Sequence, residues 1–232
     1  FTYEGDLWRV PLAGGAATRL TSHPGSEEAA HVSPDGAWIA FAGDYDGSRN
    51  VYVMPAAGGA PKRLTWTGSG VEPVTWTPDS RKVVFRSGHE NTFRPIVRLY
   101  EVGLDASLPT RLPVERGVLC SFSPDGTRIV YNRRGREEYY WKRYKGGQYQ
   151  DIWLADLKAG SFTQLTDYVG KNAYPMWVGD ALLFVSDRGE KGIANLYRRD
   201  FATGAIEQLT RFDDFDVQQP STDGRTVVFM HA

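Results

Sequence analysis

The strongest constraint on this sequence is a unit that repeats five times. A motif built on Arg or Gln followed by Leu, usually with Thr next, recurs at intervals of 44, 48, 53 and 44 residues, and an aromatic residue in a short alternating segment recurs at the same intervals. Two markers that keep one phase through the same insertions predict a repeated supersecondary unit with extra residues in its loops. The leucines are Leu20, Leu64, Leu112, Leu165 and Leu209, and the aromatic residues are Trp8, Tyr52, Tyr100, Trp153 and Tyr197.

Each repeat also contains a tight turn and an apolar strand. In Ser33-Pro34-Asp35-Gly36 the proline fixes φ, the aspartate bonds nearby backbone and the glycine takes a positive φ, which is the chemistry of a hairpin turn. An apolar run, a loop, the alternating aromatic segment, a glycine-containing turn and the Leu-Thr segment follow. Four short antiparallel strands per 45 residues or so, with no helical period, predict the blade of a β-propeller. The turns lie at 33–36, 77–80, 123–126 and 221–224, with a shorter version at 178–180.

We therefore predict an all-β fold, a β-propeller of four-stranded antiparallel blades in one domain over residues 1–232. Phe1 falls in register with Phe229, so both ends of the chain lie within a unit. This leaves two alternatives: five-bladed closure, in which the two ends share a blade, or a fragment of a six-bladed ring. The five repeat units are approximately 1–40, 41–84, 85–130, 131–183 and 184–232.

Composition excludes several classes of partner. The formal net charge is -1, from 27 Lys+Arg against 28 Asp+Glu, so no global basic field would attract nucleic acid or anionic lipid. No apolar run approaches the length that crosses a bilayer. We expect neither a nucleic acid nor a membrane partner.

The single cysteine, Cys120, excludes an intrachain disulfide and a multi-cysteine metal site, and we interpret it as a buried, inert thiol. It fits a reducing compartment, so we expect a cytoplasmic protein, with the periplasm as the alternative if an upstream signal peptide has been removed.

No catalytic motif is found in the sequence. It contains no Gly-x-Ser-x-Gly elbow, no His-Glu-x-x-His pair and no phosphate-binding glycine loop. The four histidines are scattered over different repeats, and we interpret them as surface or packing residues. The acidic run 213–216 is interpreted as a solvated connection between blades. We predict no catalytic residue, metal or cofactor in this chain.

The most unusual segment is 132–150, where basic residues alternate with five aromatic residues. Arginine forks and ring faces could hold a peptide or its carboxylate, and the same composition could stack single-stranded nucleic acid. The alternative, which we favour, is a structural plug that packs against neighbouring blades or against a further domain. The candidate peptide-binding residues are Arg133, Arg134, Trp141, Lys142, Arg143 and Tyr144.

Three motifs carry a family resemblance: Gly-Asp-Leu-Trp-Arg-Val-Pro at 5–11, Val-Tyr-Val-Met-Pro-Ala-Ala-Gly-Gly at 51–59, and Trp-Lys-Arg-Tyr-Lys-Gly-Gly at 141–147 before Asp-Ile-Trp at 151–153. Together they resemble the N-terminal six-bladed propeller of tricorn-type serine proteases, whose repeats are similar to those of TolB. The resemblance implies a non-catalytic propeller that guides peptide substrates to a protease core absent from this chain. It also implies downstream protease domains as partners.

In that family, basic residues in a loop between blades hold the substrate's carboxyl end. The matching loop here, 66–73, has no basic residue. We therefore keep the basic residues Arg133, Arg134, Lys142 and Arg143 as replacement candidates.

Two other functions remain open. One is a TolB-like protein-interaction propeller or scaffold, and the other is a propeller enzyme that acts on sugars from its central channel. We also expect that open blade edges could mediate self-association.

Overall fold

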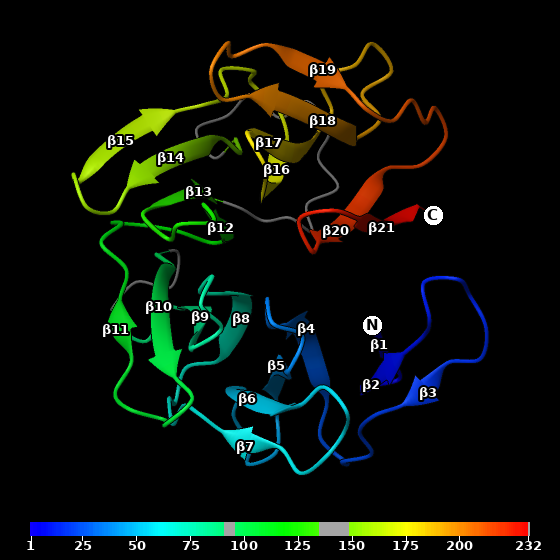
Figure 1. The fold of residues 1–232 in the computed structure, drawn as a ribbon, viewed down its shortest axis with the longest axis vertical. Helices are drawn as coiled ribbons and strands as arrows, with labels where there is room; N and C mark the ends of the chain where they lie inside the picture. The colour runs from blue at the N-terminus through cyan, green and yellow to red at the C-terminus, as the bar shows by residue number, and fades with distance from the viewer. Residues whose placement is uncertain (91–95, 135–148, 232) are drawn as a thin grey trace. The chain divides into compact units, whose positions relative to one another are not determined.

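The computed structural model describes residues 1–90, 96–134 and 149–231, and its regular elements there are all β-strands (Figure 1). The all-β prediction is confirmed. The chain divides into two compact units, Phe1–Val114 and Glu115–Ala232. The predicted boundaries of the five repeats and the number of blades in the ring stay predictions.

The first unit contains three antiparallel sheets. One sheet has three strands in the order β1-β2-β3, and the other two have four strands each, β4-β5-β6-β7 and β8-β9-β10-β11. The strands are β1 (Thr2–Tyr3), β2 (Asp6–Arg9), β3 (Thr18–Arg19), β4 (Glu27–Val32), β5 (Trp38–Gly43), β6 (Asn50–Pro55), β7 (Lys62–Arg63), β8 (Val71–Trp76), β9 (Lys82–Ser87), β10 (Arg98–Gly103) and β11 (Thr110–Arg111).

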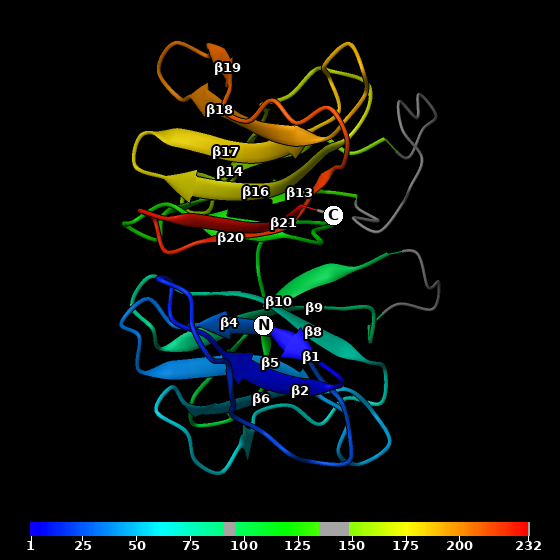
Figure 2. The ribbon, with the colours of Figure 1, turned by 90° about the vertical axis from the view of Figure 1, so that its right-hand side faces the viewer.

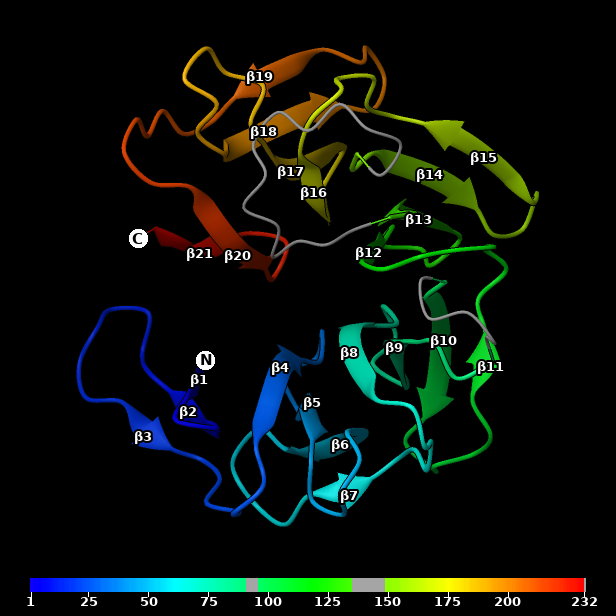
Figure 3. The same cartoon turned by 180° about the vertical axis from the view of Figure 1, so that it is seen from behind.

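The second unit contains two four-stranded sheets, β12-β13-β14-β15 and β16-β17-β18-β19, and the hairpin β20-β21. Figure 2 shows the hairpin, and Figure 3 shows the four-stranded sheets from behind. The strands are β12 (Cys120–Phe122), β13 (Arg128–Asn132), β14 (Ile152–Asp156), β15 (Ser161–Gln164), β16 (Asn172–Val178), β17 (Ala181–Ser186), β18 (Asn195–Asp200), β19 (Ile206–Gln208), β20 (Val217–Thr222) and β21 (Val227–His231).

The Pro-Asp-Gly turns connect the first and second strands of the sheets, as predicted. In the first complete sheet, Asp35 Oδ1 accepts a hydrogen bond from the Ser33 hydroxyl at 2.6 Å and from the Ala37 N–H at 3.0 Å. These bonds, led by the Ser33 hydroxyl, lower the pKa of Asp35. The same serine or threonine to aspartate bond recurs at Thr77–Asp79 and Ser123–Asp125. The turn therefore closes through its own side chains.

The Leu-Thr motif is a fastener between the third and fourth strands. The Leu64 N–H donates to the Val51 carbonyl at 2.8 Å, and Thr65 Oγ1 accepts from the Val51 N–H at 2.9 Å. The threonine side chain therefore adds one more hydrogen bond to the third strand after the backbone pairing of the fourth strand has ended. Equivalent threonine bonds are Thr21 to Leu7, Thr166 to Ile152 and Thr210 to Leu196. The third repeat keeps the leucine bond, Leu112 to Leu99, but has Pro113 in place of threonine.

The hydrophobic core lies between successive sheets of each unit. Phe85 and Tyr100 of one sheet and Ala40 and Val53 of its neighbour belong to one buried cluster. In the second unit, Phe184 is fully buried in a cluster that also contains Val130 of the preceding sheet. Because both faces of the middle strands are covered, β17 is buried along its whole length.

Four first strands carry a β-bulge, which the sequence did not reveal. The pairing register shifts in β4, β8, β16 and β20. Three of these bulges contain a residue with positive φ: Ala29 at 51°, Tyr174 at 54° and Gln219 at 45°. Bulges bend a strand and increase its local twist.

Candidate functional site

A pocket of about 220 Å³ opens beside the end of β13 and the start of β14 in the second unit. Arg133 and Arg134 follow β13 directly, and Asp151 directly precedes β14. Trp153 belongs to β14, where it pairs with Tyr131 on one side and Gln164 on the other. The lining residues are Arg133, Arg134, Tyr149, Asp151, Trp153 and Gln164.

Arg133 lies over an aromatic ring. Its guanidinium carbon is 4.8 Å from the centre of the Trp153 ring, and the Trp153 Nε1–H donates to Asp151 Oδ2 at 2.7 Å. The carboxylate therefore fixes the indole, and the indole supports the guanidinium. Within residues 1–90, 96–134 and 149–231, no carboxylate forms an ion pair with Arg133. Among these residues, therefore, its N–H edges are not taken by a carboxylate.

The rest of the pocket is polar. Two arginines and one aspartate are among its lining residues. Gln164 is held at the rim because its Nε2 donates to the Thr166 carbonyl at 2.7 Å. Burial raises the pKa of Tyr131, the strand partner of Trp153, to about 12, so this phenol stays neutral. The arrangement suits an anionic group that lies in the plane of the guanidinium beside a flat apolar surface.

The structure places two of the six predicted binding residues in this pocket, Arg133 and Arg134. The other four, Trp141, Lys142, Arg143 and Tyr144, lie outside the described residues. Sequence reasoning missed Tyr149, Asp151, Trp153 and Gln164 as lining residues. Trp153 was recognised as a repeat marker and as part of the family motif at 151–153, but not as a binding residue, although its pairing with Tyr131, two residues before Arg133, follows from the repeat. Peptide binding by these residues stays a prediction.

Stacking on the third-strand aromatic residue is a recurrent structural feature, which provides a comparison for Arg133. The rings of Tyr45 and His89 lie 4.5 and 4.6 Å from the rings of their own sheets' third-strand tyrosines. Arg188 lies 5.3 Å from the Tyr197 ring and also bonds Asn172 Oδ1 and Ser186. Arg133 differs because its stacked guanidinium lacks such side-chain acceptors in the described part of the chain.

A larger pocket, of about 360 Å³, lies in the first unit, but three of its polar side chains, those of Thr21, His23 and Tyr45, are already hydrogen-bonded. Its walls include His23 and Tyr45, whose rings are 3.9 Å apart. The buried Glu27 accepts hydrogen bonds from the hydroxyls of Tyr45 and Thr21, both at 2.7 Å. This network stabilises the junction of two sheets, so we consider the Arg133 pocket the stronger candidate.

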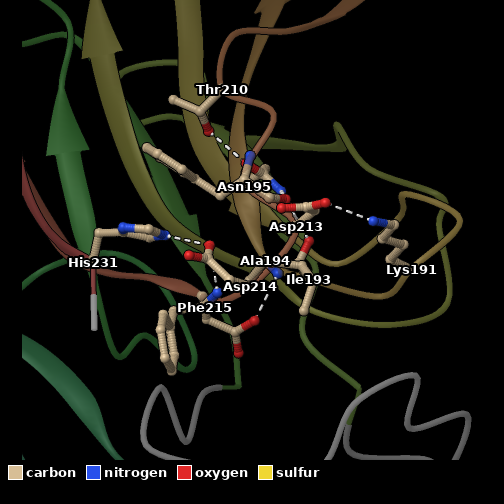
Figure 4. A network of polar contacts seen from close by, with 11 residues as sticks. Lys191, Ile193, Ala194, Asn195, Thr210, Asp213, Asp214, Phe215 and His231 are labelled. Atoms are coloured by element: carbon tan, nitrogen blue, oxygen red, sulfur yellow. Dashed lines mark hydrogen bonds and ion pairs between the residues drawn. The ribbon is translucent and has the colours of Figure 1, made fainter.

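The acidic run between β19 and β20 is exposed at three of its four residues, as predicted for a connection. Each carboxylate has a partner, and Figure 4 shows those of Asp213 and Asp214. Asp213 pairs with Lys191 at 2.7 Å, Asp214 contacts His231 at 3.1 Å, and Asp216 accepts from the Ala194 N–H at 2.9 Å. These contacts fasten the connection to the preceding sheet and to β21.

Cys120 is buried, and burial raises the pKa of its thiol to about 12. Across the described ranges, no three His, Cys, Asp or Glu side chains are grouped so that they could hold a metal ion. A search of the same ranges finds no helix with the length and apolarity to span a bilayer.

Comparison with known proteins identifies close likenesses over the whole chain. The sequence model of the tricorn protease N-terminal β-propeller domain matches residues 1–232. "Tricorn protease homolog 1" of Streptomyces coelicolor is 34% identical over 100% of this chain and 22% of its own length. "Tricorn protease homolog" of Saccharolobus solfataricus is 27% identical over the same shares. This chain therefore spans about a fifth of the length of these curated relatives.

Solved structures agree with the sequence comparison. The crystal structure of the tricorn protease matches 98% of this chain and 23% of its own chain, with a TM-score of 0.83 and 25% identity. TolB from Acinetobacter baumannii matches 96% of this chain and 53% of its own, with a TM-score of 0.71 and 19% identity, which shows a common propeller fold. What is matched in the tricorn proteins is the propeller domain, not the protease core, and this chain belongs to the family of tricorn protease N-terminal β-propeller domains.

Proposed function

We propose that this chain is a non-catalytic, substrate-guiding propeller of a tricorn-like serine protease, and that it holds peptides through the pocket at Arg133. The observation that supports the proposal is the Arg133 guanidinium, which lies on the Trp153 ring at 4.8 Å with its N–H edges free of any carboxylate in the described ranges. A peptide offers both groups that such a pocket would bind, a carboxylate for the guanidinium and an apolar side chain for the rings.

The carboxylate would be the α-carboxylate of a peptide or an acidic side chain near it. A planar guanidinium donates two parallel N–H bonds to such a group, and an indole behind it limits the rotamers that must be immobilised on binding. The pocket is open to solvent, so binding would be reversible, as passage of a substrate requires.

The test uses two fluorescent peptides that differ only at the C-terminus, one with a free carboxylate and one with an amide. Binding to the full-length protein that contains these residues is followed by fluorescence anisotropy. For the Arg133→Gln variant we expect affinity for the carboxylate peptide to fall about tenfold or more, the effect of losing a charge-assisted hydrogen bond. Affinity for the amide peptide should change little.

The matched control is Arg128→Gln. Arg128 also lies over a tryptophan, 5.0 Å from the Trp177 ring, but at the start of β13 rather than at its end. Equal losses in both variants, or unchanged binding in Arg133→Gln, would contradict a specific role for Arg133. Peptide cleavage by the same variants then tests guidance: unchanged rate and selectivity would refute it.

A further inference from the structure

Asn172 is a buried polar residue at a position where two other repeats have valine. It is the first residue of β16, and its counterparts at the start of β8 and β20 are Val71 and Val217, all nearly inaccessible to solvent. In register, Asn172 pairs with Ser186, as Val71 pairs with Ser87 and Val217 with the matching residue of β21. A buried amide has to be hydrogen-bonded to be tolerated, whereas valine needs no partner.

The amide of Asn172 is fully engaged. Its Nδ2 donates to the carbonyl of Gln150 at 2.9 Å and to that of Tyr168 at 2.8 Å. Its Oδ1 accepts from Arg188 Nη2 at 2.9 Å and from the Ser186 hydroxyl at 3.2 Å. Because the oxygen is taken by Arg188 and Ser186, the NH₂ group has to face the Gln150 carbonyl.

A second buried amide acts on the next carbonyl. Asn132, the last residue of β13 and 1% exposed, donates from Nδ2 to the Asp151 carbonyl at 2.7 Å and to the Asn172 carbonyl at 2.8 Å. The two asparagines therefore hold two consecutive carbonyls immediately before β14. One of them extends from the preceding strand and the other from the neighbouring sheet.

Other repeats hold the matching carbonyl with backbone rather than with a side chain. The Val71 N–H donates to the Arg49 carbonyl at 3.2 Å, and the Val217 N–H donates to the Ala194 carbonyl at 2.8 Å. Arg49 and Ala194 lie three residues before the third-strand aromatic residues Tyr52 and Tyr197, as Gln150 lies three before Trp153. Among these three sheets, only here does a side chain rather than a backbone N–H link the neighbouring sheet to this carbonyl, so substitution can release it.

Arg188 keeps the network rigid. Its guanidinium lies 5.0 to 5.5 Å from the rings of Phe184, Tyr197 and Tyr168 and donates to Ser186 Oγ at 3.1 Å. The rings and the hydrogen bonds fix the direction in which Nη2 points at Asn172. The Asn172 amide is thus fully hydrogen-bonded, and buried polar groups satisfied in this way hold one arrangement.

Both walls of the Arg133 pocket are attached to this network. Arg133 directly follows Asn132, and Tyr149 and Asp151 flank Gln150. We propose that Asn132 and Asn172 are positioning residues, which fix the Tyr149–Asp151 wall against the Arg133 wall and so preorganise the peptide pocket. This inference rests on the proposed peptide binding, although the anchoring itself can be tested without any peptide.

The experiment compares Asn172→Val and Asn132→Ala with the matched control Asn195→Ala in the full-length protein. Asn195 is a buried asparagine of the same unit that holds the Phe212 carbonyl at 3.0 Å and accepts from Thr210, away from the pocket. Hydrogen exchange of residues 149–154 is read by mass spectrometry, and binding of the carboxylate peptide by anisotropy. Asn132→Ala is the milder variant. Asn132 Oδ1 is buried without a hydrogen-bond partner, so loss of that oxygen breaks no bond, and only the two bonds donated by Nδ2 are lost.

For both pocket variants we expect exchange in 149–154 to accelerate by about tenfold, and peptide affinity to fall by about tenfold, while the control changes neither. Unchanged exchange would refute the anchoring. Faster exchange with unchanged affinity would refute positioning, as would equal effects of Asn195→Ala. If the unsubstituted protein binds no carboxylate peptide, the proposed function fails and positioning of a peptide site fails with it, while the exchange result still decides whether the two asparagines anchor the segment.

Discussion

The threonine of the Leu-Thr motif should contribute more to stability than its size suggests, and Thr65→Val measures that contribution. Thr65 is 1% exposed. Its Oγ1 accepts from the Val51 N–H at 2.9 Å and donates to Asn50 Oδ1 at 3.0 Å. Valine has nearly the same shape, so the substitution removes the hydrogen bonds without leaving a cavity.

The expected loss follows from the groups left behind. The Val51 N–H becomes a buried donor without a partner, which costs about 1–3 kcal/mol, and the hydroxyl bond to Asn50 contributes about 0.5–1.5 kcal/mol. Asn50 Oδ1 keeps a bond from the Thr67 N–H at 3.0 Å, so it is not left unpaired. The additional buried methyl recovers about 0.8 kcal/mol. We expect a net loss of about 1–4 kcal/mol in the free energy of unfolding, centred on about 2 kcal/mol.

Urea denaturation followed by tryptophan fluorescence measures this loss as a lower midpoint at unchanged slope, a shift of roughly 1 M for a typical slope. Two controls separate the causes. Thr65→Ser keeps the hydroxyl and should lose only about 1 kcal/mol, and Thr163→Val on the exposed strand β15 should change stability by less than about 0.5 kcal/mol. If Thr65→Val is no worse than Thr65→Ser, the fastener role of the hydroxyl is wrong.

Three further predictions concern pH, reactivity and backbone space. Hydrogen bonds, led by that of the Ser123 hydroxyl, lower the pKa of Asp125 to about 2. The contribution of the ionised Asp125 carboxylate to folding stability is therefore complete above about pH 4 and is lost as pH falls toward 2. The Asp125→Asn variant should accordingly flatten acid denaturation in that window. Burial raises the pKa of Cys120 to about 12, so a thiol reagent at pH 8 should label it only after urea unfolding, and rapid labelling of the native protein would contradict its burial. A Cβ at Gly25 would overlap a main-chain carbonyl oxygen in the loop after β5, so Gly25→Ala should destabilise by about 1–3 kcal/mol in the same urea assay. Gly68→Ala meets open space and should change stability by less than about 0.5 kcal/mol; equal effects would refute the steric argument.

The strand order of the repeat was predictable because its markers are local. The turn at 33–36 and the Leu64-Thr65 pair each act within a few residues of their partners or on the adjacent strand. Because the interacting residues are close in sequence and the pattern recurs in five repeats, the sequence alone was enough to predict these turns and strand ends. The bulges were not predictable, since a positive φ at Ala29 or Tyr174 depends on packing between sheets rather than on residue type.

The candidate site was predictable only in part. Arg133 and Arg134 lie in the unusual segment that the composition singled out, but Trp153 and Gln164 reach the pocket through strand pairing. The Asn132–Asn172 contact joins residues 40 positions apart in different sheets, and nothing in either local sequence indicates the other. Sequence periodicity predicts which face of a strand a residue lies on. A contact between two sheets can be predicted only when the packing of one sheet against the next is known.

The fastener at each Leu-Thr also explains how the chain tolerates changes in length. Each repeat secures its third strand to its fourth with bonds that start and end inside that repeat, as Thr166 does with Ile152. A connection can therefore lengthen without shifting the register of any sheet, and the spacing of 53 residues before Leu165 is accommodated as readily as 44. The fold separates the residues that hold it together from those free to diverge, so new recognition surfaces can evolve in one connection while the neighbouring blades stay unchanged.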